Sequence, residues 1–193
     1  QFDDWELVAV DDGSTDATAA ILERYAGILG PRMRVVRHPG GVNRGMSASR
    51  NLGIRESRGE LVTFLDHDDI LLPGKLAAHV ATFEANPEAV VVIGPNLRWS
   101  SWAGSGREDE VQDLGVPAGT TLPPPGPLPA FLTRSRAAPL GITVRREDLE
   151  AVGGFEDAFT GMYEDQVLQA KLYTRHPVHV LEEVHHRYRQ HPD

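Results

Sequence analysis

Trp5-Glu6-Leu7-Val8-Ala9-Val10 is a short apolar run that stops at Asp11-Asp12-Gly13. A buried strand has this composition, and where it ends it delivers polar groups to the edge of its sheet. Ser14-Thr15-Asp16 then offers capping side chains for a helix over 17–26, with Gly27 just beyond its end. The beginning of the chain therefore predicts a strand, a turn and a helix.

Apolar runs and helical spacing continue to alternate along the chain. Strands are expected over 33–36, 61–65, 89–94, 141–144 and 178–181, and helices over 47–57, around Leu76, Val80 and Phe83, over 146–152 and over 164–174. This order predicts an α/β fold with a Rossmann-like mixed, mostly parallel sheet flanked by helices. The length of 193 residues fits one compact domain over 1–193.

The stretch from Trp99 to Pro139 has no clear period and is rich in glycine, serine, acids and proline. Loops longer than roughly 12 to 15 residues are uncommon inside compact domains and are often functional. We therefore expect an irregular segment that helps to select the substrates. Trp99 and Trp102, at its entrance, would either stack on a sugar ring or fill the core.

The overall composition excludes several classes of function. The 28 acidic and 19 basic residues give a net charge of −9, which argues against wrapping nucleic acid or binding anionic lipid through bulk charge. Without cysteine there is no thiolate site, so a metal ion would need carboxylates and histidines. No apolar run approaches the roughly 20 residues of a membrane-spanning helix. We expect a cytoplasmic protein, with a peripheral position at the inner membrane face left open.

Two of the predicted strands end in acidic clusters, Asp11-Asp12 and Asp66 to Asp69. Because ligands of open α/β sheets bind at the carboxyl ends of strands, we expect both clusters to face one crevice. Clustered carboxylates repel one another unless a cation offsets their charge, which favours Mg²⁺ or Mn²⁺. The alternative is that aspartates only end the strands, as they do in many turns.

Several segments, in order along the chain, resemble signatures of the family 2 glycosyltransferases. They are Val10 to Asp16, Asn43-Arg44-Gly45 with Ala48 to Gly53, Gly59 to Asp69 with its Asp-x-Asp motif, Gly153-Gly154-Phe155, Glu164-Asp165, and Tyr188-Arg189-Gln190-His191. The resemblance implies a GT-A fold, with donor binding in 1–98 and acceptor binding in 99–193. It also implies inverting, metal-dependent transfer from a nucleoside-diphosphate sugar, with a UDP-sugar favoured. The acceptor would be a carbohydrate, a lipid-linked hydroxyl or another hydroxyl, in polysaccharide or glycoconjugate biosynthesis.

Carried over residue by residue, the resemblance implies a set of donor contacts. Asp12 would hydrogen-bond the base of the nucleotide, and Asp11 would support it. Asp66 would contact the ribose or the sugar, and Asp69 would orient the donor sugar. Arg50 would offset phosphate or carboxylate charge, or else form a surface salt bridge.

The resemblance also implies the catalytic and metal-binding residues. Asp68 would bind the Mn²⁺ or Mg²⁺ ion, with His191 as the histidine expected to assist it. Asp165, at the start of a helix, would be the general base, while Glu164 would be a competing base or a capping carboxylate. His67 would be structural.

The family pattern begins with a further strand, which would precede Gln1, so part of the donor site is expected outside this sequence. A Gln-x-x-Arg-Trp segment, typical of processive polysaccharide synthases, is absent, which favours addition of a single sugar.

Two rival functions share parts of this pattern. A phospho-accepting receiver domain would explain Asp11-Asp12 and Asp66, but neither Lys75 nor Lys171 stands where a receiver needs its lysine. A nucleotidyltransferase of similar fold would need a glycine-rich basic loop after its first strand. That strand is the one expected before Gln1, so this alternative stays open.

Overall fold

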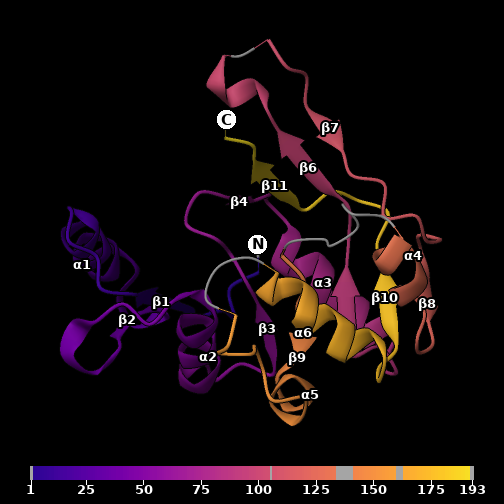
Figure 1. The fold of residues 1–193 in the computed structure, drawn as a ribbon, viewed down its shortest axis with the longest axis horizontal. Helices are drawn as coiled ribbons and strands as arrows, with labels where there is room; N and C mark the ends of the chain where they lie inside the picture. The colour runs from indigo at the N-terminus through magenta and orange to yellow at the C-terminus, as the bar shows by residue number, and fades with distance from the viewer. Residues whose placement is uncertain (1, 105, 134–140, 160–162, 192–193) are drawn as a thin grey trace. The chain divides into compact units, whose positions relative to one another are not determined.

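The computed structural model describes residues 2–104, 106–133, 141–159 and 163–191 (Figure 1). They form two compact units. The first unit holds residues 3–62 and 146–168, and the second holds residue 2, 63–145 and 169–191. The expected single catalytic domain, with its halves 1–98 and 99–193, stays a prediction.

The first unit is built on a parallel pair of strands with helices beside it. Its elements are β1 (Leu7–Asp11), α1 (Thr18–Leu29), η1 (Gly30–Arg32), β2 (Met33–Arg37), η2 (Pro39–Gly41), α2 (Met46–Glu56), most of β3 (Leu61–Thr63), α5 (Arg146–Ala151) and the first half of α6 (Glu164–Tyr173). Strands β1 and β2 pair from Leu7 opposite Met33 to Asp11 opposite Arg37. A strand–helix–strand connection of this kind is the predicted start of the fold.

Helix α1 begins one residue after the predicted start at Ala17 and ends three residues after the predicted end at Ala26. The Asp16 carboxylate accepts a hydrogen bond of 2.9 Å from the backbone N–H of Thr18, which caps the first turn. The helix continues through Gly27 to Leu29. Gly30 ends it, because its φ of 56° is a conformation that glycine adopts without a Cβ clash.

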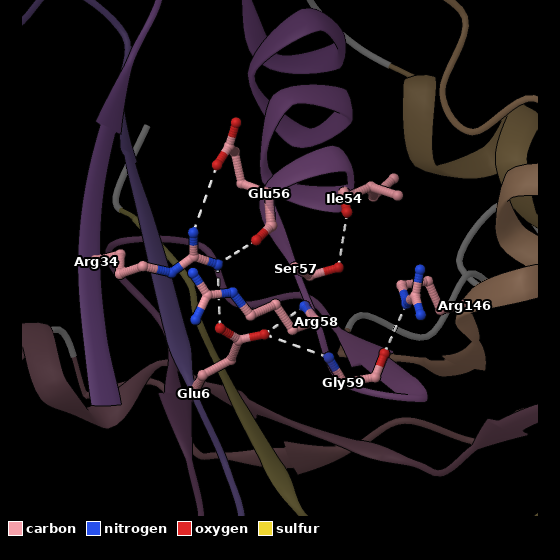
Figure 2. A network of polar contacts seen from close by, with 8 residues as sticks. All are labelled: Glu6, Arg34, Ile54, Glu56, Ser57, Arg58, Gly59 and Arg146. Carbon is pink, nitrogen blue, oxygen red and sulfur yellow. Dashed lines mark hydrogen bonds and ion pairs between the residues drawn. The ribbon is translucent and has the colours of Figure 1, made fainter. Parts of the chain in front are cut away.

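A polar network joins the end of α2 to β2 and to the segment before β1 (Figure 2). Arg34 of β2 donates to Glu6 at 3.1 Å and to the Glu56 carboxylate at 3.4 Å. The other oxygen of Glu6 accepts the backbone N–H groups of Arg58 and Gly59. Since Glu6 precedes β1, this network lies at the opposite end of the strand from Asp11. It therefore stabilises the scaffold at the end remote from the acidic cluster.

The second unit contains two sheets. Its elements are β4 (Ile70–Leu71), α3 (Lys75–Ala85), β5 (Val91–Ile93), β6 (Asn96–Trp99), η3 (Ser101–Ala103), β7 (Glu110–Val111), β8 (Thr120–Leu122), α4 (Leu128–Thr133), β9 (Thr143–Arg145), the second half of α6, β10 (Val178–Val180) and β11 (His186–Arg189). One sheet has the order β3-β9-β5-β10-β8, with Thr63 of β3 in this unit, and the other has the order β4-β11-β6-β7.

The core of the second unit lies around β5 and β10. The side chains of Val91, Val92, Val178 and Val180 are each at most 1% exposed, as is Tyr173 at the end of α6. Such near-continuous apolar strands are typical of a sheet covered on both faces.

The sheets are mixed. Pairing is parallel between β1 and β2, β5 and β10, and β6 and β11, and it is antiparallel between β4 and β11, β7 and β6, β8 and β10, and β9 and β5. The predicted α/β class, with mixed sheets flanked by helices, is confirmed.

The expectation of an irregular segment over 99–139 was wrong in part. Strands β7 and β8 and helix α4 lie within it. These strands have only two or three residues, too few to show a period of two. They form because β6 and β10 offer edges with which they can pair.

Candidate functional site

Asp11 ends β1 as a buried carboxylate with two partners. Its side chain accepts the backbone N–H of Ser14 at 3.0 Å and the Arg37 guanidinium at 2.9 Å. The Ser14 N–H and then Arg37 hold the pKa of Asp11 below its usual range despite burial. Asp11 is therefore ionised and shapes the turn after β1, while its expected role in supporting the donor contact of Asp12 stays a prediction.

Asp12 joins this turn to the glycine-rich loop before α2. Its carboxylate oxygens accept the backbone N–H groups of Arg44 at 2.7 Å and Gly45 at 2.9 Å. Gly13 permits the close approach, because its φ is +79° and a Cβ there would lie 2.8 Å from the Asn43 nitrogen. Asp12 thus holds the loop before α2, and its side chain keeps about a fifth of its surface exposed.

Arg50 of α2 pairs with Glu164 of α6. Its Nη1 lies 2.6 Å from Glu164 Oε1, with side chains only 14% and 6% exposed, and its guanidinium lies 5.3 Å from the centre of the Phe155 ring. The other oxygen, Oε2, is buried without a hydrogen-bond partner in the described part of the chain. Arg50 thus forms a largely buried ion pair with Glu164, and its expected role at the donor stays a prediction.

Asn51 explains why two of the quoted motifs occur together. Its side-chain amide donates to the Phe155 carbonyl and to Asp157, and its Oδ1 accepts the Phe155 N–H, each at 2.9 Å. Gly154 fits beside it because a Cβ would stand 2.5 Å from Asn51 Oδ1. No role was predicted for Asn51, although it lies inside the segment Ala48 to Gly53 that resembles a family motif, and this position indicated a role.

Asp165 stands in the first turn of α6, directly after the anchored Glu164. Its Oδ1 accepts the backbone N–H of Gln166 at 2.8 Å, and the residue is partly exposed. A carboxylate at a helix N-terminus is stabilised by the positive end of the helix dipole. Asp165 is thus held at the surface of the first unit by the Arg50–Glu164 pair.

In the second unit, the acidic segment after β3 is pinned to β11. Asp69 has a side chain only 1% exposed; its oxygens lie 2.8 Å from His186 Nε2 and accept the Arg189 backbone N–H at 2.9 Å. The Asp69 N–H in turn donates to the Asp66 carbonyl, which closes the loop. His67, between them, is exposed.

Asp68 and His191 meet across 123 positions of sequence. Their Oδ2 and Nε2 atoms lie 2.8 Å apart, and their side chains are 26% and 56% exposed. Burial raises the pKa of Asp68, but the His191 hydrogen bond, with weaker backbone and His67 contributions, lowers it by more in total. This ionised, accessible carboxylate beside an imidazole is the pair that the sequence analysis named for the metal.

Trp102 supports the tail that carries His191. Its Nε1 donates to the Gln190 carbonyl at 2.8 Å, and its ring centre lies 5.3 Å from that of His191. The guanidinium of Arg189 lies between the two tryptophans, 5.1 Å from the Trp99 ring and 4.8 Å from the Trp102 ring. In the structure, then, both tryptophans take part in packing the C-terminal tail.

Within the described residues, no group of three or more histidines and carboxylates is arranged as a complete metal site. Mg²⁺ and Mn²⁺ do not require one, since Mg²⁺ commonly takes one or two carboxylates and completes its shell with substrate phosphates and water. The described helices include none long and apolar enough to cross a membrane.

The family model described as "Glycosyl transferase family 2" matches residues 1–112. The chain belongs to this family. The putative glycosyltransferase EpsH of Bacillus subtilis is 41% identical to this chain over 71 residues. The match covers 37% of this chain and 20% of that protein. The succinoglycan biosynthesis protein ExoO of Rhizobium meliloti is 36% identical over 106 residues, 51% of this chain and 29% of that protein.

Solved structures agree with the family at the level of the fold. S. aureus TarS 1-349 superposes with a TM-score of 0.70 and 24% identity, over 94% of this chain and 50% of that one. The same protein in complex with UDP gives a TM-score of 0.69 with 23% identity, over 96% and 51%. The chain thus spans about half the length of these structures and less than a third of the length of the two curated relatives above. Because the chain belongs to the family 2 glycosyltransferases, the receiver and nucleotidyltransferase alternatives lose their support.

Proposed function

We propose that this chain is the core of a metal-dependent glycosyltransferase that moves a sugar from a UDP-sugar to an acceptor hydroxyl with inversion. The observation that carries the proposal is the contact between Asp68 and His191. Family membership supports the reaction class, and the UDP-bound TarS structure supports the choice of nucleotide.

The donor atoms of this pair fit Mn²⁺ or Mg²⁺. Asp68 offers an ionised carboxylate, and His191 offers an imidazole nitrogen that Mn²⁺ accepts more readily than Mg²⁺ does. When bound, the cation would stabilise the charge that builds on the departing diphosphate. Asp66 would contact the ribose or sugar, as the family resemblance implies.

Asp12 and Asp165 would be the base-binding and proton-accepting residues. Asp12 holds the loop before α2 and keeps part of its carboxylate exposed, which supports a contact to the nucleotide base, with Asp11 fixing the turn. Asp165 would take the proton from the acceptor hydroxyl as that oxygen attacks the anomeric carbon. The pairing of Glu164 with Arg50 favours a positioning role for both and leaves Asp165 as the base.

Burial changes the role proposed for Asp69. Its side chain is 1% exposed and both of its oxygens are engaged, which favours holding the loop of Asp68 over contacting the donor sugar. The names of two relatives, the succinoglycan biosynthesis protein and the dodecaprenyl-phosphate galacturonate synthase of Rhizobium johnstonii, support a carbohydrate or lipid-linked acceptor. We propose that the enzyme is cytoplasmic and lies at the inner membrane face.

Calorimetry of UDP binding to the whole protein, with and without Mn²⁺, tests the proposal. Wild type should bind UDP more tightly with the metal, and Asp68→Ala should lose most of that metal dependence. Glu110→Ala is the matched control. Glu110 is a carboxylate of the same unit, its side chain is 71% exposed, and its ion pair with Arg98 is long, at 3.8 Å. Metal dependence that persists in Asp68→Ala would overturn the assignment. The anomeric configuration of the product, read by NMR, tests inversion.

A further inference from the structure

Lys75 is a buried cation to which the proposed reaction gives no task. It is the first residue of α3, and only 2% of it is exposed. Its ammonium donates to the Gly141 carbonyl, and no described carboxylate forms an ion pair with it. An ammonium removed from water costs several kcal/mol unless its surroundings offset the loss, so its burial needs an explanation.

His186 of β11 lies buried between this lysine and the metal loop. It is 3% exposed, and its Nε2 is 2.8 Å from Asp69 Oδ2. A carboxylate only accepts, so Nε2 carries the hydrogen of this bond. In neutral His186 the other nitrogen, Nδ1, is then an acceptor, and it is buried with no hydrogen-bond partner among the described residues.

Gly141 brings the two nitrogens into one space. A Cβ on Gly141 would stand 2.4 Å from His186 Nδ1 and 2.7 Å from Lys75 Nζ, distances that no real Cβ tolerates. The φ of Gly141 is +65°, which also favours glycine. The missing side chain therefore leaves the lysine ammonium and the unpartnered nitrogen next to each other.

We propose that Lys75 and His186 are positioning residues that hold the metal loop through a chain from Lys75 to His186 Nδ1 and from His186 Nε2 to Asp69. The inference rests on the proposed role of Asp68 in binding the metal and the donor. The Lys75 ammonium is the donor group beside Nδ1, and its charge favours the Nε2–H form that the Asp69 contact selects. Its positive charge lies on the far side of the imidazole from the buried negative charge of Asp69, so the two are linked without direct contact.

The chain acts on Asp68 through the backbone. Asp69 accepts from the Arg189 N–H and donates its own N–H to the Asp66 carbonyl, so the turn that carries Asp68 is held at Asp66 and Asp69. Leu72, at the end of the loop, donates its N–H to the His185 carbonyl at 3.0 Å. Loss of the Asp69 anchor should therefore weaken metal binding at Asp68 without touching the metal ligands themselves.

The neighbouring histidines on the same side do not replace Lys75 as the donor. His79 Nδ1 is engaged with Thr143 Oγ1 at 2.7 Å, and the His185 ring lies edge-on to it at 5.6 Å. Burial lowers the pKa of both rings, and the lysine charge adds to this effect. Lys75 is thus the positive group of this cluster.

Nitrogen-15 NMR of the histidines in the whole protein tests the tautomer directly. Wild-type His186 should show the Nε2–H form, and in Lys75→Met the Nδ1 resonance should shift because the neighbouring ammonium is lost. An Nδ1–H tautomer in the wild type would overturn the proposal, and this result does not depend on whether the protein binds UDP.

Calorimetry with Mn²⁺ and UDP separates positioning from a merely structural role. Lys75→Met should weaken metal-dependent UDP binding by about tenfold, and it should raise the melting temperature because a buried charge is removed. Lys171→Met, at the other lysine of the chain, is the matched control and should leave the affinity unchanged. Unchanged affinity in Lys75→Met would overturn the proposal.

A second variant covers the case in which Lys75→Met does not fold. Gly141→Ala inserts a methyl group between the two nitrogens and should also weaken metal-dependent UDP binding about tenfold. If Gly141→Ala binds as wild type does, the chain is not what holds the loop. If the wild type itself shows no metal-dependent UDP binding, the proposed function fails, while the tautomer measurement still decides the present inference.

Discussion

Arg50 and Glu164 form a 2.6 Å ion pair that is largely shielded from solvent and ties α2 to the first turn of α6. Glu164 directly precedes Asp165, and these two adjacent acids of the Glu-Asp motif have different surroundings. Glu164 is 5% exposed, whereas Asp165 is partly exposed. This difference in exposure is the basis for proposing Glu164 as a positioning acid and Asp165 as the base.

Substitution at the two acids should therefore give different kinetics. Asp165→Asn should abolish sugar transfer while UDP binding stays near wild type, because the amide cannot take the acceptor proton. Glu164→Gln should lower kcat by about tenfold, since the anchor weakens while the base remains. Steady-state kinetics with calorimetry of UDP binding distinguish the two. Full activity in Asp165→Asn would reject this base.

The buried ion pair should also matter for stability. Arg50→Met leaves the Glu164 carboxylate buried without its cation and should lower the free energy of unfolding by about 3 to 5 kcal/mol. Adding Glu164→Gln to Arg50→Met should restore part of the loss, because no uncompensated charge remains. Urea unfolding gives both values. Arg55→Met, at an exposed site on the same helix, is the control and should stay within about 0.5 kcal/mol of wild type.

The lock between Asn51 and the Gly-Gly-Phe segment should be equally measurable. Asn51→Ala removes three hydrogen bonds and should cost about 2 to 4 kcal/mol of unfolding free energy. Gly154→Ala should also destabilise, because its Cβ would collide with Asn51 Oδ1.

Gly153→Ala is the matched control for this lock. Gly153 has a positive φ of +81° like its neighbour, but a Cβ there would meet no atom within 4 Å. It should therefore cost only backbone strain, roughly 1 kcal/mol. Equal losses in Gly153→Ala and Gly154→Ala would show that strain, and not the contact with Asn51, is what matters.

The burial of Lys75 predicts a stability that rises with pH. Burial lowers the pKa of Lys75 from 10.5 to about 8. Below about pH 8 the ammonium is charged in both folded and unfolded chains, so the cost of burying it is fully present. Between about 8 and 10.5 the unfolded chain binds the proton that the folded chain has released, and stability increases by roughly 3 kcal/mol in total. Above that range the cost is absent.

Urea unfolding at pH 7.5, 8.5 and 9.5 measures this effect. Lys75→Met should lack the increase over this range, because it has no group to titrate at this position. Wild-type stability that does not rise relative to Lys75→Met would show that the Lys75 ammonium is not held in an unfavourable buried position.

By itself the sequence determined the elements whose pattern is local. Apolar runs and helical spacing predicted β1, α1, β2, α2, α3, β5, α6 and β10, because a period of two or 3.6 residues and the caps beside it are written in neighbouring positions. The motif order was also enough to predict the family, and with it Asp68 and His191 as partners at one metal.

Only the tertiary structure decided which side chains are withdrawn from solvent and which remain accessible. Asp69 and Glu164 become buried anchors while their neighbours Asp68 and Asp165 stay accessible, although no local pattern separates the members of either pair. His186 meets Asp69, and Lys75 lies beside His186 at Gly141, because α3 and β11 pack together, and strands as short as β7 and β8 exist only beside their partners. Burial and pairing depend on contacts between residues far apart in the chain, and these form only when the chain closes on itself.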